Sequence, residues 1–369
     1  MLSWCQMVFF RCSAGPLTRL PRRCRRLLRG QGVFLLYRSR FAFVVVAACA
    51  AVGLHVTATR ALTIIPTFDT TITTNSNATY FESQINSAIS AIDSYIANPI
   101  TVDITFEGVN YGLGSNSLSS GANISYSTYR AAITNNQTLS AADTSALATL
   151  PTSFPVPGDS PANPNAQVGL AGPLARALGI AFNGTIGGTI YANLGSMMLP
   201  QYSVTQNASR YSMQYVVAHE IDEILGIGGD GSSLNEIYYG YSGTLTNAEV
   251  GPLDLFRYSA DGVRSFATAS TATAYFSIDG GKTNLVNFNQ NSNGDYGDCT
   301  GTSQVQNWSG TQGRVLYLGA NEMTALDVVG WNLTPLGTAL ETGHPVPEPA
   351  TMAILLCGGL PLLARRKRS

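Results

Sequence analysis

The sequence predicts an α+β domain with a small mixed sheet, one central helix that carries ionisable side chains, and a large irregular C-terminal part. Three observations support this fold class. A helical pattern at residues 80–97 is followed by a strand pattern at 100–109. A short strand pattern at 188–194 precedes a second helical pattern at 209–225. From Ala61 onward the chain is rich in Thr, Ser, Asn, Gly and Ala, with few charged residues.

The first helix and strand follow from the spacing of their apolar residues. In the helix, these residues recur every three or four positions: Phe81, Ile85, Ile89, Ile92 and Ile96. Pro99 ends the helix because proline cannot continue its hydrogen bonding. In the strand, apolar residues alternate with polar ones: Ile100, Val102, Ile104 and Phe106.

The rest of the domain is less regular. Residues 112–165 are rich in Ser, Asn and Pro, so we expect loops there around one helix at 127–133. We expect 188–194 to be a short strand, either an edge strand or an ordinary core strand. A last helix has apolar residues near helical spacing and Asn321 as its candidate cap: Met323, Leu326, Val329 and Trp331.

Charge is distributed unevenly along the chain. Residues 1–61 hold ten arginines and no acid, and residues 365–368 are all basic. Of the 21 basic and 22 acidic residues, 7 basic and 21 acidic ones therefore fall in residues 62–346, a net charge near −14. A body this acidic argues against nucleic-acid binding, which needs positive charge against the phosphates.

The N-terminal leader has the features of an export signal. Arg38 and Arg40 precede an apolar run at 41–54, which is too short for a membrane span. We therefore expect export and cleavage by signal peptidase after Ala58 or Ala61. Between leader and tail, Cys299 is the one cysteine, so the domain cannot form an internal disulfide and must rely on its core.

The C-terminal tail, residues 347–369, has three parts in a specific order. The sequence Pro-Glu-Pro is followed by a short apolar run at 350–364 and then by the basic cluster. This order resembles the PEP-CTERM sorting signal of exported proteins in Gram-negative bacteria. The resemblance implies transient membrane anchoring, processing by an exosortase, and a final place at the cell surface, in the outer membrane or outside the cell. An ordinary tail anchor is the alternative, and residues 336–346 are a linker.

The second helix holds the residues of chemical interest, in the run VVAHEIDEIL. His219 and Glu223 are four residues apart, so their side chains meet on one flank. Glu220 lies between that flank and the apolar face, and Asp222 is expected to point to solvent on the opposite side. Gly226 is a natural stop for the helix.

This spacing is typical of metal-dependent hydrolysis. A rigid helical pair supplies two ligands about 2 Å from a zinc ion, and a neighbouring Glu220 can move the proton of the attacking water. In the usual His-Glu-x-x-His helix, a second histidine stands where this chain has Glu223. A carboxylate there weakens zinc as a Lewis acid and favours harder metals such as Mn²⁺ or Ca²⁺.

The third ligand must be a carboxylate, a carbonyl or water, because the body holds no second histidine before the linker. We favour Asp254, in PLDLFRY, over Asp230, in the loop after the helix. The alternatives are an ion pair of Asp254 with Arg257 and a turn role for Asp230. Asp295 and Asp298, in NGDYGD, are candidates for a separate Ca²⁺ site or for a polar turn.

Several runs together resemble a family of PEP-CTERM-bearing proteins assigned as metalloproteases, related in outline to metzincins: HEIDEILGIGG, GPLDLFRYSADGVRSF, YFSIDGG, GDYGD and MTALDVVGWN. The resemblance covers residues 62–335. It implies a zincin (metzincin-like) domain with a cleft between a sheet-containing part and an irregular part. It also implies His219 and Glu223 as metal ligands, Glu220 as general base and a peptide or protein substrate. Where metzincins have a third histidine this chain has Gly229, and no methionine turn follows.

The sequence therefore leaves two alternative functions. The first is an exported, surface-sorted, metal-dependent endopeptidase with Zn²⁺ as its cofactor. The second is a non-catalytic surface or biofilm-matrix protein on a degenerate zincin scaffold, which a body of low charge rich in Thr, Asn and Gly suits equally well. Metal content and the effect of Glu220→Gln discriminate between them. A glycosidase would need two facing carboxylates, and no motif points to one.

Overall fold

The computed structural model describes most of the chain between the leader and the tail: residues 61–135, 139–153, 167–181, 183–235 and 249–343. All of these residues belong to one unit, Thr59–Ser369. The expected export signal and the sorting tail lie outside the described residues. Within the described ranges, no helix combines the length and apolar character needed to cross a membrane.

A four-stranded mixed sheet is built from the first half of the domain. In spatial order its strands are β1 (Thr63–Phe68), β2 (Thr101–Val109), β6 (Gly187–Asn193) and β3 (Gly114–Leu118). β1, β2 and β6 run parallel, and β3 pairs antiparallel with β6. The strand predicted at 188–194 is therefore an internal strand, and β3 lies at the edge of the sheet.

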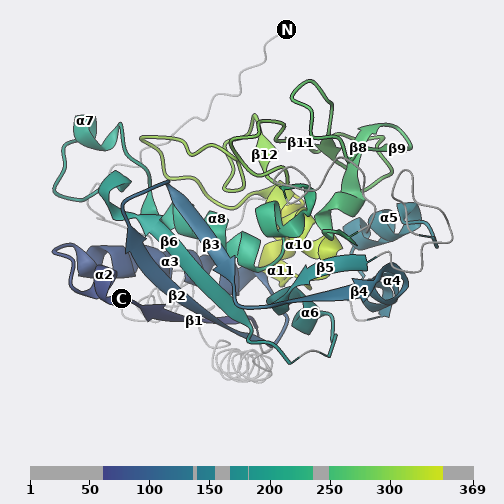
Figure 1. The fold of residues 1–369 in the computed structure, drawn as a ribbon, viewed down its shortest axis with the longest axis horizontal. Helices are drawn as coiled ribbons and strands as arrows, with labels where there is room; N and C mark the ends of the chain where they lie inside the picture. Colours follow the sequence, from purple (N-terminus) through teal and green to yellow (C-terminus); the bar gives the residue numbers. More distant parts are fainter. Residues whose placement is uncertain (1–60, 136–138, 154–166, 182, 236–248, 344–369) are drawn as a thin grey trace, which may run out of the picture. The chain divides into compact units, whose positions relative to one another are not determined.

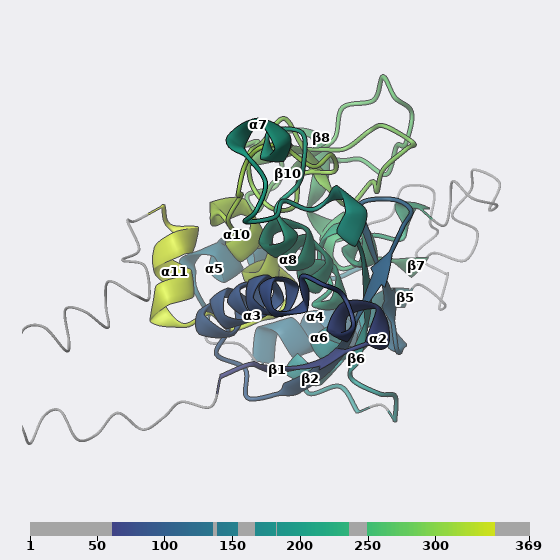
Figure 2. The same ribbon diagram turned by 90° about the vertical axis from the view of Figure 1, so that its left-hand side faces the viewer.

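Two helices cover this sheet and pack against each other: α3 (Ala78–Tyr95) and α8 (Met213–Ile224). The face of α3 predicted from its isoleucines is buried. α8 contacts both β3 and β6. In both ribbon views, α8 lies between this sheet and the C-terminal strands (Figure 1, Figure 2).

Local signals fix the two ends of α8. The Ser212 hydroxyl accepts a hydrogen bond from the Tyr215 backbone N–H, so the helix begins later than the predicted residue 209. Gly226 has φ of +97°, a conformation that favours glycine, and it ends the helix as predicted. The expectation for Asp222 is wrong: its side chain is fully buried, and burial together with the nearby charge of Glu322 raises its pKa well above the ordinary value. The indole N–H of Trp331 donates to the Leu225 carbonyl at the end of the helix.

The stretch predicted as loops contains regular structure. A three-stranded sheet joins β4 (Gly121–Ser125), β5 (Gln167–Ala171) and β7 (Glu249–Val250). Helices α4 (Tyr126–Asn135) and α6 (Gly172–Ala177) pack near it, whereas α5 (Ala141–Thr149) packs against α10 (Ala320–Val329). The helix predicted at 127–133 falls within α4. β3 escaped prediction because Gly, Ser and Asn fill most of both faces. In β4 only Ala122 and Ile124 alternate with polar residues, which is too short a pattern to predict a strand.

The C-terminal part is mostly irregular, as predicted. Its five-stranded antiparallel sheet is made of very short strands: β8 (Arg257–Ala260), β9 (Val263–Arg264), β10 (Tyr275–Phe276), β11 (Val286–Phe288) and β12 (Cys299–Thr300). α10 (Ala320–Val329) and α11 (Pro335–Glu341) close the domain. Gly319, not Asn321, is the N-cap of α10. The remaining elements are single turns: α2 (Thr70–Thr73), η1 (Leu194–Ser196), α7 (Val204–Asn207), η2 (Gly228–Gly231) and η3 (Leu253–Phe256).

Candidate metal centre

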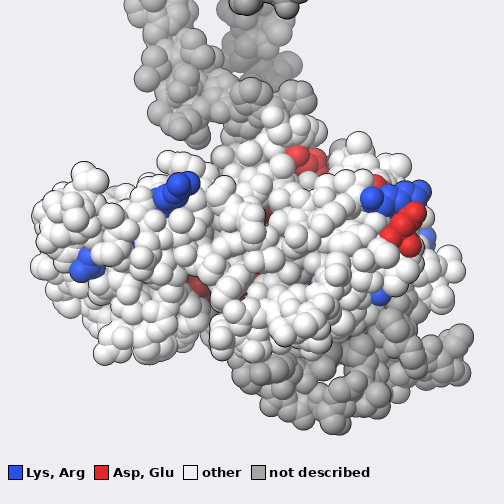
Figure 3. Space-filling view, turned by 90° about the horizontal axis from the view of Figure 1, so that it is seen from above, with Lys and Arg blue, Asp and Glu red and all other residues white. Residues whose placement is uncertain are grey.

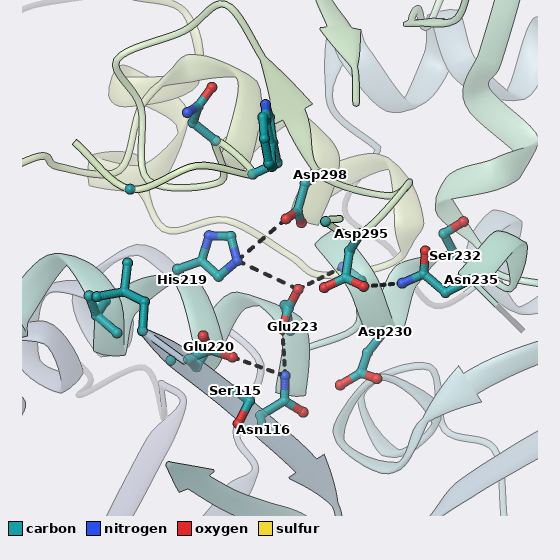
Figure 4. A pocket seen from close by; sticks show the side chains of 18 of the residues that line it. Ser115, Asn116, His219, Glu220, Glu223, Asp230, Ser232, Asn235, Asp295 and Asp298 are labelled. Atoms are coloured by element: carbon teal, nitrogen blue, oxygen red, sulfur yellow. Dashed lines mark hydrogen bonds and ion pairs between the residues drawn. The ribbon is translucent and has the colours of Figure 1, made fainter. Parts of the chain in front are cut away.

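Three potential metal ligands meet beside α8. The Nε2 atom of His219 lies 3.6 Å from Oε1 of Glu223 and 3.6 Å from Oδ2 of Asp298. One ligand atom from each residue lies within 4.8 Å of the other two. Figure 4 shows the imidazole facing both carboxylates, with Asp298 reaching down from the loop before β12. The described residues contain no other such group of three.

These distances suit a single ion. Two ligands that each lie ~2.1 Å from a tetrahedral ion are roughly 3.4 Å apart. The two 3.6 Å separations at His219 are close to that value before any ion draws the ligands together. The imidazole is 14% exposed and the two carboxylates are 5% and 3% exposed, so the group is sheltered but reachable. The group could therefore bind a metal ion.

Outer partners orient the ligands. The Val305 carbonyl lies 2.9 Å from Nδ1 of His219. Because a carbonyl only accepts, Nδ1 carries a proton and Nε2 faces the carboxylates. Oδ1 of Asp298 accepts a hydrogen bond of 2.9 Å from Nε2 of Gln306. Oε1 of Glu223 accepts one of 2.8 Å from the Gly229 N–H. Partners of this kind are what metal ligands require to hold their geometry.

Glu220 lies beside the ligand group, between α8 and the edge strand β3. It is 5% exposed and lines the same cavity as His219. A Cβ atom on Gly114 of β3 would stand 2.4 Å from Oε1 of Glu220. Only glycine at this position lets the strand come so close, so the sequence of β3 makes room for this carboxylate.

The cavity around the centre has a volume of about 420 Å³. Five carboxylates line it, and none of its described lining residues is a lysine or an arginine: Glu220, Glu223, Asp230, Asp295 and Asp298. In the space-filling view, acidic side chains are visible deep within a hollow near the middle of the face (Figure 3). The field in this cavity therefore favours a cation.

The protonation of the group reflects its burial and its crowding. Burial lowers the pKa of His219, but the charges of Asp298 and Glu220 and the Val305 carbonyl raise it to about 9. Burial raises the pKa of Asp298 to about 7, against the opposing effect of His219. Burial also raises the pKa of Glu223 well above its ordinary value, and the neighbouring carboxylates raise it further. An arriving cation must therefore displace protons, so its affinity will depend on pH.

Asp254, the third ligand that the sequence favoured, is not part of this group. Its Oδ1 accepts a hydrogen bond of 2.6 Å from the Ser232 hydroxyl. Its Oδ2 accepts bonds of 2.9 Å from Gly251 N–H and 3.0 Å from Ser233 N–H. The Asp254 carboxylate is 2% exposed and secures the loops at η2 and η3. The third member of the ligand group is therefore Asp298, where the sequence suggested Asp254. The alternative partner, Arg257, donates to the Tyr296 carbonyl at 2.6 Å.

The other two candidate acids lie close to the centre without joining the ligand group. Asp230, in η2, lines the cavity. Asp295 also lines it, and its Oδ1 contacts the amide nitrogen of Asn235. The proposed calcium pair is therefore divided: Asp298 faces His219, and Asp295 faces Asn235. The sequence held only a weak signal for Asp298: GDYGD is one of the family-like runs, and a third ligand was still needed.

Comparison of the chain with protein-family models, with curated proteins and with solved structures gave no significant match. The function must therefore be argued from the site itself.

Proposed function

We propose that the protein is a metal-dependent peptidase of the zincin type, with Zn²⁺ held by His219, Glu223 and Asp298. The observation that supports this most directly is the position of Nε2 of His219, 3.6 Å from a carboxylate oxygen on either side. One nitrogen and two oxygens form a borderline-to-hard donor set, so Mn²⁺ is the main competitor for the site.

Each residue then has a defined role. When bound, a divalent cation polarises the carbonyl of the scissile peptide bond and makes a water molecule nucleophilic at neutral pH. Glu220 lies next to the ligands and is buried against β3, where it can take the proton from the attacking water. It can then deliver that proton to the leaving amine. Its close contact with β3 keeps the Glu220 carboxylate within the same cavity as the ligands.

A peptide is the favoured substrate because of the edge strand. β3 pairs with β6 on one side only, among the described strands, and it lines the cavity through Gly114, Ser115 and Asn116. An extended peptide could pair with its free backbone groups and pass the ligand group. The order of parallel strands, antiparallel edge strand and central helix supports the zincin assignment. Export, sorting by the C-terminal tail and processing by an exosortase stay part of this proposal on the basis of the sequence.

The test is Glu220→Gln, which keeps the shape of the side chain and removes the base. Wild type and variant are compared for cleavage of a mixed peptide library, with metal content measured on the same samples. We expect the variant to keep its ion and to lose at least ~100-fold in turnover. Equal cleavage by both proteins would remove Glu220 from the mechanism.

A non-catalytic surface role is the second candidate, and one observation favours it. With a pKa of about 9, His219 is protonated at neutral pH in the metal-free protein and lies between two carboxylates. The positive charge of the imidazole would then offset negative charge of the buried acids without an ion, as in a structural cluster. A protein that takes up no ion on titration would favour this role.

A further inference from the structure

We infer that Asn116 is a positioning residue that holds both the metal ligand Glu223 and the base Glu220. Its amide nitrogen lies 2.5 Å from Oε2 of Glu223 and 3.3 Å from Oε2 of Glu220. Figure 4 shows this nitrogen between the two carboxylates, joined to both. The catalytic part of the inference rests on the proposed function, but the part that concerns metal binding does not.

The backbone places this side chain where it can act. Asn116 lies on the edge strand β3, opposite Ile190 of β6, and β3 packs against α8. Side chains alternate along a strand, so Gly114 and Asn116 share the face toward α8 while Ser115 and Ser117 are exposed. Gly114 makes room for Glu220, and Asn116 contacts it.

The chemistry of an amide suits this position. Glu220 and Glu223 lie three residues apart on one helix, so their charges repel each other. A side-chain amide has two N–H donors and can give one to each carboxylate without adding charge. With Oε2 occupied in both residues, Oε1 of Glu223 is left facing His219, and Oε1 of Glu220 is left beside Gly114. Asn116 thereby determines which oxygen each carboxylate offers.

Other residue types would not do this. Aspartate has the same shape but its carboxylate only accepts, and it would add a sixth acidic side chain to the cavity. Serine and alanine are too short to reach both oxygens. The amide also belongs to the strand that would pair with substrate, so it connects the substrate edge of the cavity to the two carboxylates.

The experiment measures Zn²⁺ affinity and peptide cleavage separately in the full-length protein. Zn²⁺ alone is titrated against a chromophoric chelator, using wild type, Asn116→Ala and Asn116→Thr. Threonine suits a strand and lacks the amide, so it guards against a variant that fails to fold. Asn193→Ala is the matched control, because this asparagine of β6 donates its amide to the Gly112 carbonyl and to neither carboxylate.

We expect both Asn116 variants to bind Zn²⁺ about 10–100-fold more weakly, as is usual when an outer partner of a metal ligand is lost. At saturating Zn²⁺, kcat should fall while KM stays near the wild-type value. Asn193→Ala should match wild type in both measurements. Weaker Zn²⁺ binding in a protein that cleaves no peptide supports the positioning role and contradicts the peptidase proposal. Folded Asn116 variants with wild-type Zn²⁺ affinity, or a wild type that binds no Zn²⁺, overturn the inference.

Discussion

Nε2 of His219 and Oδ2 of Asp298 lie 3.6 Å apart, although one residue belongs to α8 and the other to the loop before β12. The candidate centre therefore spans the boundary between the sheet-and-helix half and the irregular half of the domain. The irregular half also holds His219, because Nδ1 of His219 donates to the Val305 carbonyl. The irregular part thus supplies one ligand of the centre and fixes the orientation of another.

This relationship predicts different results for two aspartates. Asp298→Asn should weaken Zn²⁺ binding by at least ~10-fold, because the variant loses a charged ligand. Asp254→Asn should leave Zn²⁺ binding near wild type and instead lower the free energy of unfolding by about 1–3 kcal/mol, because a buried acceptor of loop hydrogen bonds is weakened. Metal titration and thermal unfolding measure the two effects. If Asp254→Asn weakened Zn²⁺ binding and Asp298→Asn did not, Asp254 would be a ligand in place of Asp298.

Gly114→Ala tests the contact between β3 and the base. The new Cβ would stand 2.4 Å from Oε1 of Glu220, so the carboxylate or the strand must move. We expect turnover to fall by at least ~10-fold, because a catalytic group is displaced by about an ångström. Metal content should be unchanged. Ser117→Ala is the control, because Ser117 is exposed on the same strand and does not line the cavity. A Gly114→Ala variant with full activity would show that Glu220 has room to shift.

A second acidic cluster predicts a pH dependence of stability. Burial, and after it the charge of Asp143, raise the pKa of Asp327, in α10, to about 8. A carboxyl whose pKa is raised on folding stabilises the protein fully below its unfolded pKa near 4 and loses that contribution as pH rises towards 8. Asp327→Asn should therefore remove up to ~4 kcal/mol of the loss in unfolding free energy between pH 5 and pH 8, because each pKa unit is worth ~1.4 kcal/mol. Denaturant unfolding of wild type and Asp327→Asn at pH 5 and pH 8 measures this difference. If the unfolding free energy falls equally in both proteins between the two pH values, the prediction is wrong.

Trp331, which directly follows the C-cap of α10, predicts a link between the end of that helix and α8. Its indole N–H donates a hydrogen bond of 2.9 Å to the Leu225 carbonyl, and its side chain is fully buried. Trp331→Phe should lower the free energy of unfolding by about 1–3 kcal/mol, because the carbonyl loses a partner and a small void is left. Urea unfolding gives this value. A variant as stable as wild type would mean that water replaces the indole at the helix end.

The sequence was a good guide to elements with regular apolar spacing. The helix at Ala78–Tyr95, the strand at Thr101–Val109 and the helix that ends before Gly226 were predicted within a few residues. β3 was missed because its residues are Gly, Ser, Asn and Leu, whose pattern indicates a loop. Its place in the sheet comes from pairing with β6, which is a property of the tertiary fold.

Of the residues in the candidate centre, the sequence predicted only those that lie on α8. His219, Glu220 and Glu223 follow from helical spacing, which depends on local geometry alone. Asp298 and Asn116 reach the same place from distant segments, so no local pattern could select them over other acids and amides. The predicted exposure of Asp222 was wrong for the same reason, because its burial beside Glu322 of α10 depends on the tertiary fold.

The most direct test of a metal centre at His219 is the metal content of the purified protein, measured by mass spectrometry for wild type beside His219→Ala. We predict about one divalent ion per wild-type chain and almost none in the variant, because His219 contacts both other ligands. The identity of the ion would decide between zinc and manganese. A wild-type protein that folds without metal and takes up no ion on titration would contradict the proposed centre and leave the cluster a structural one.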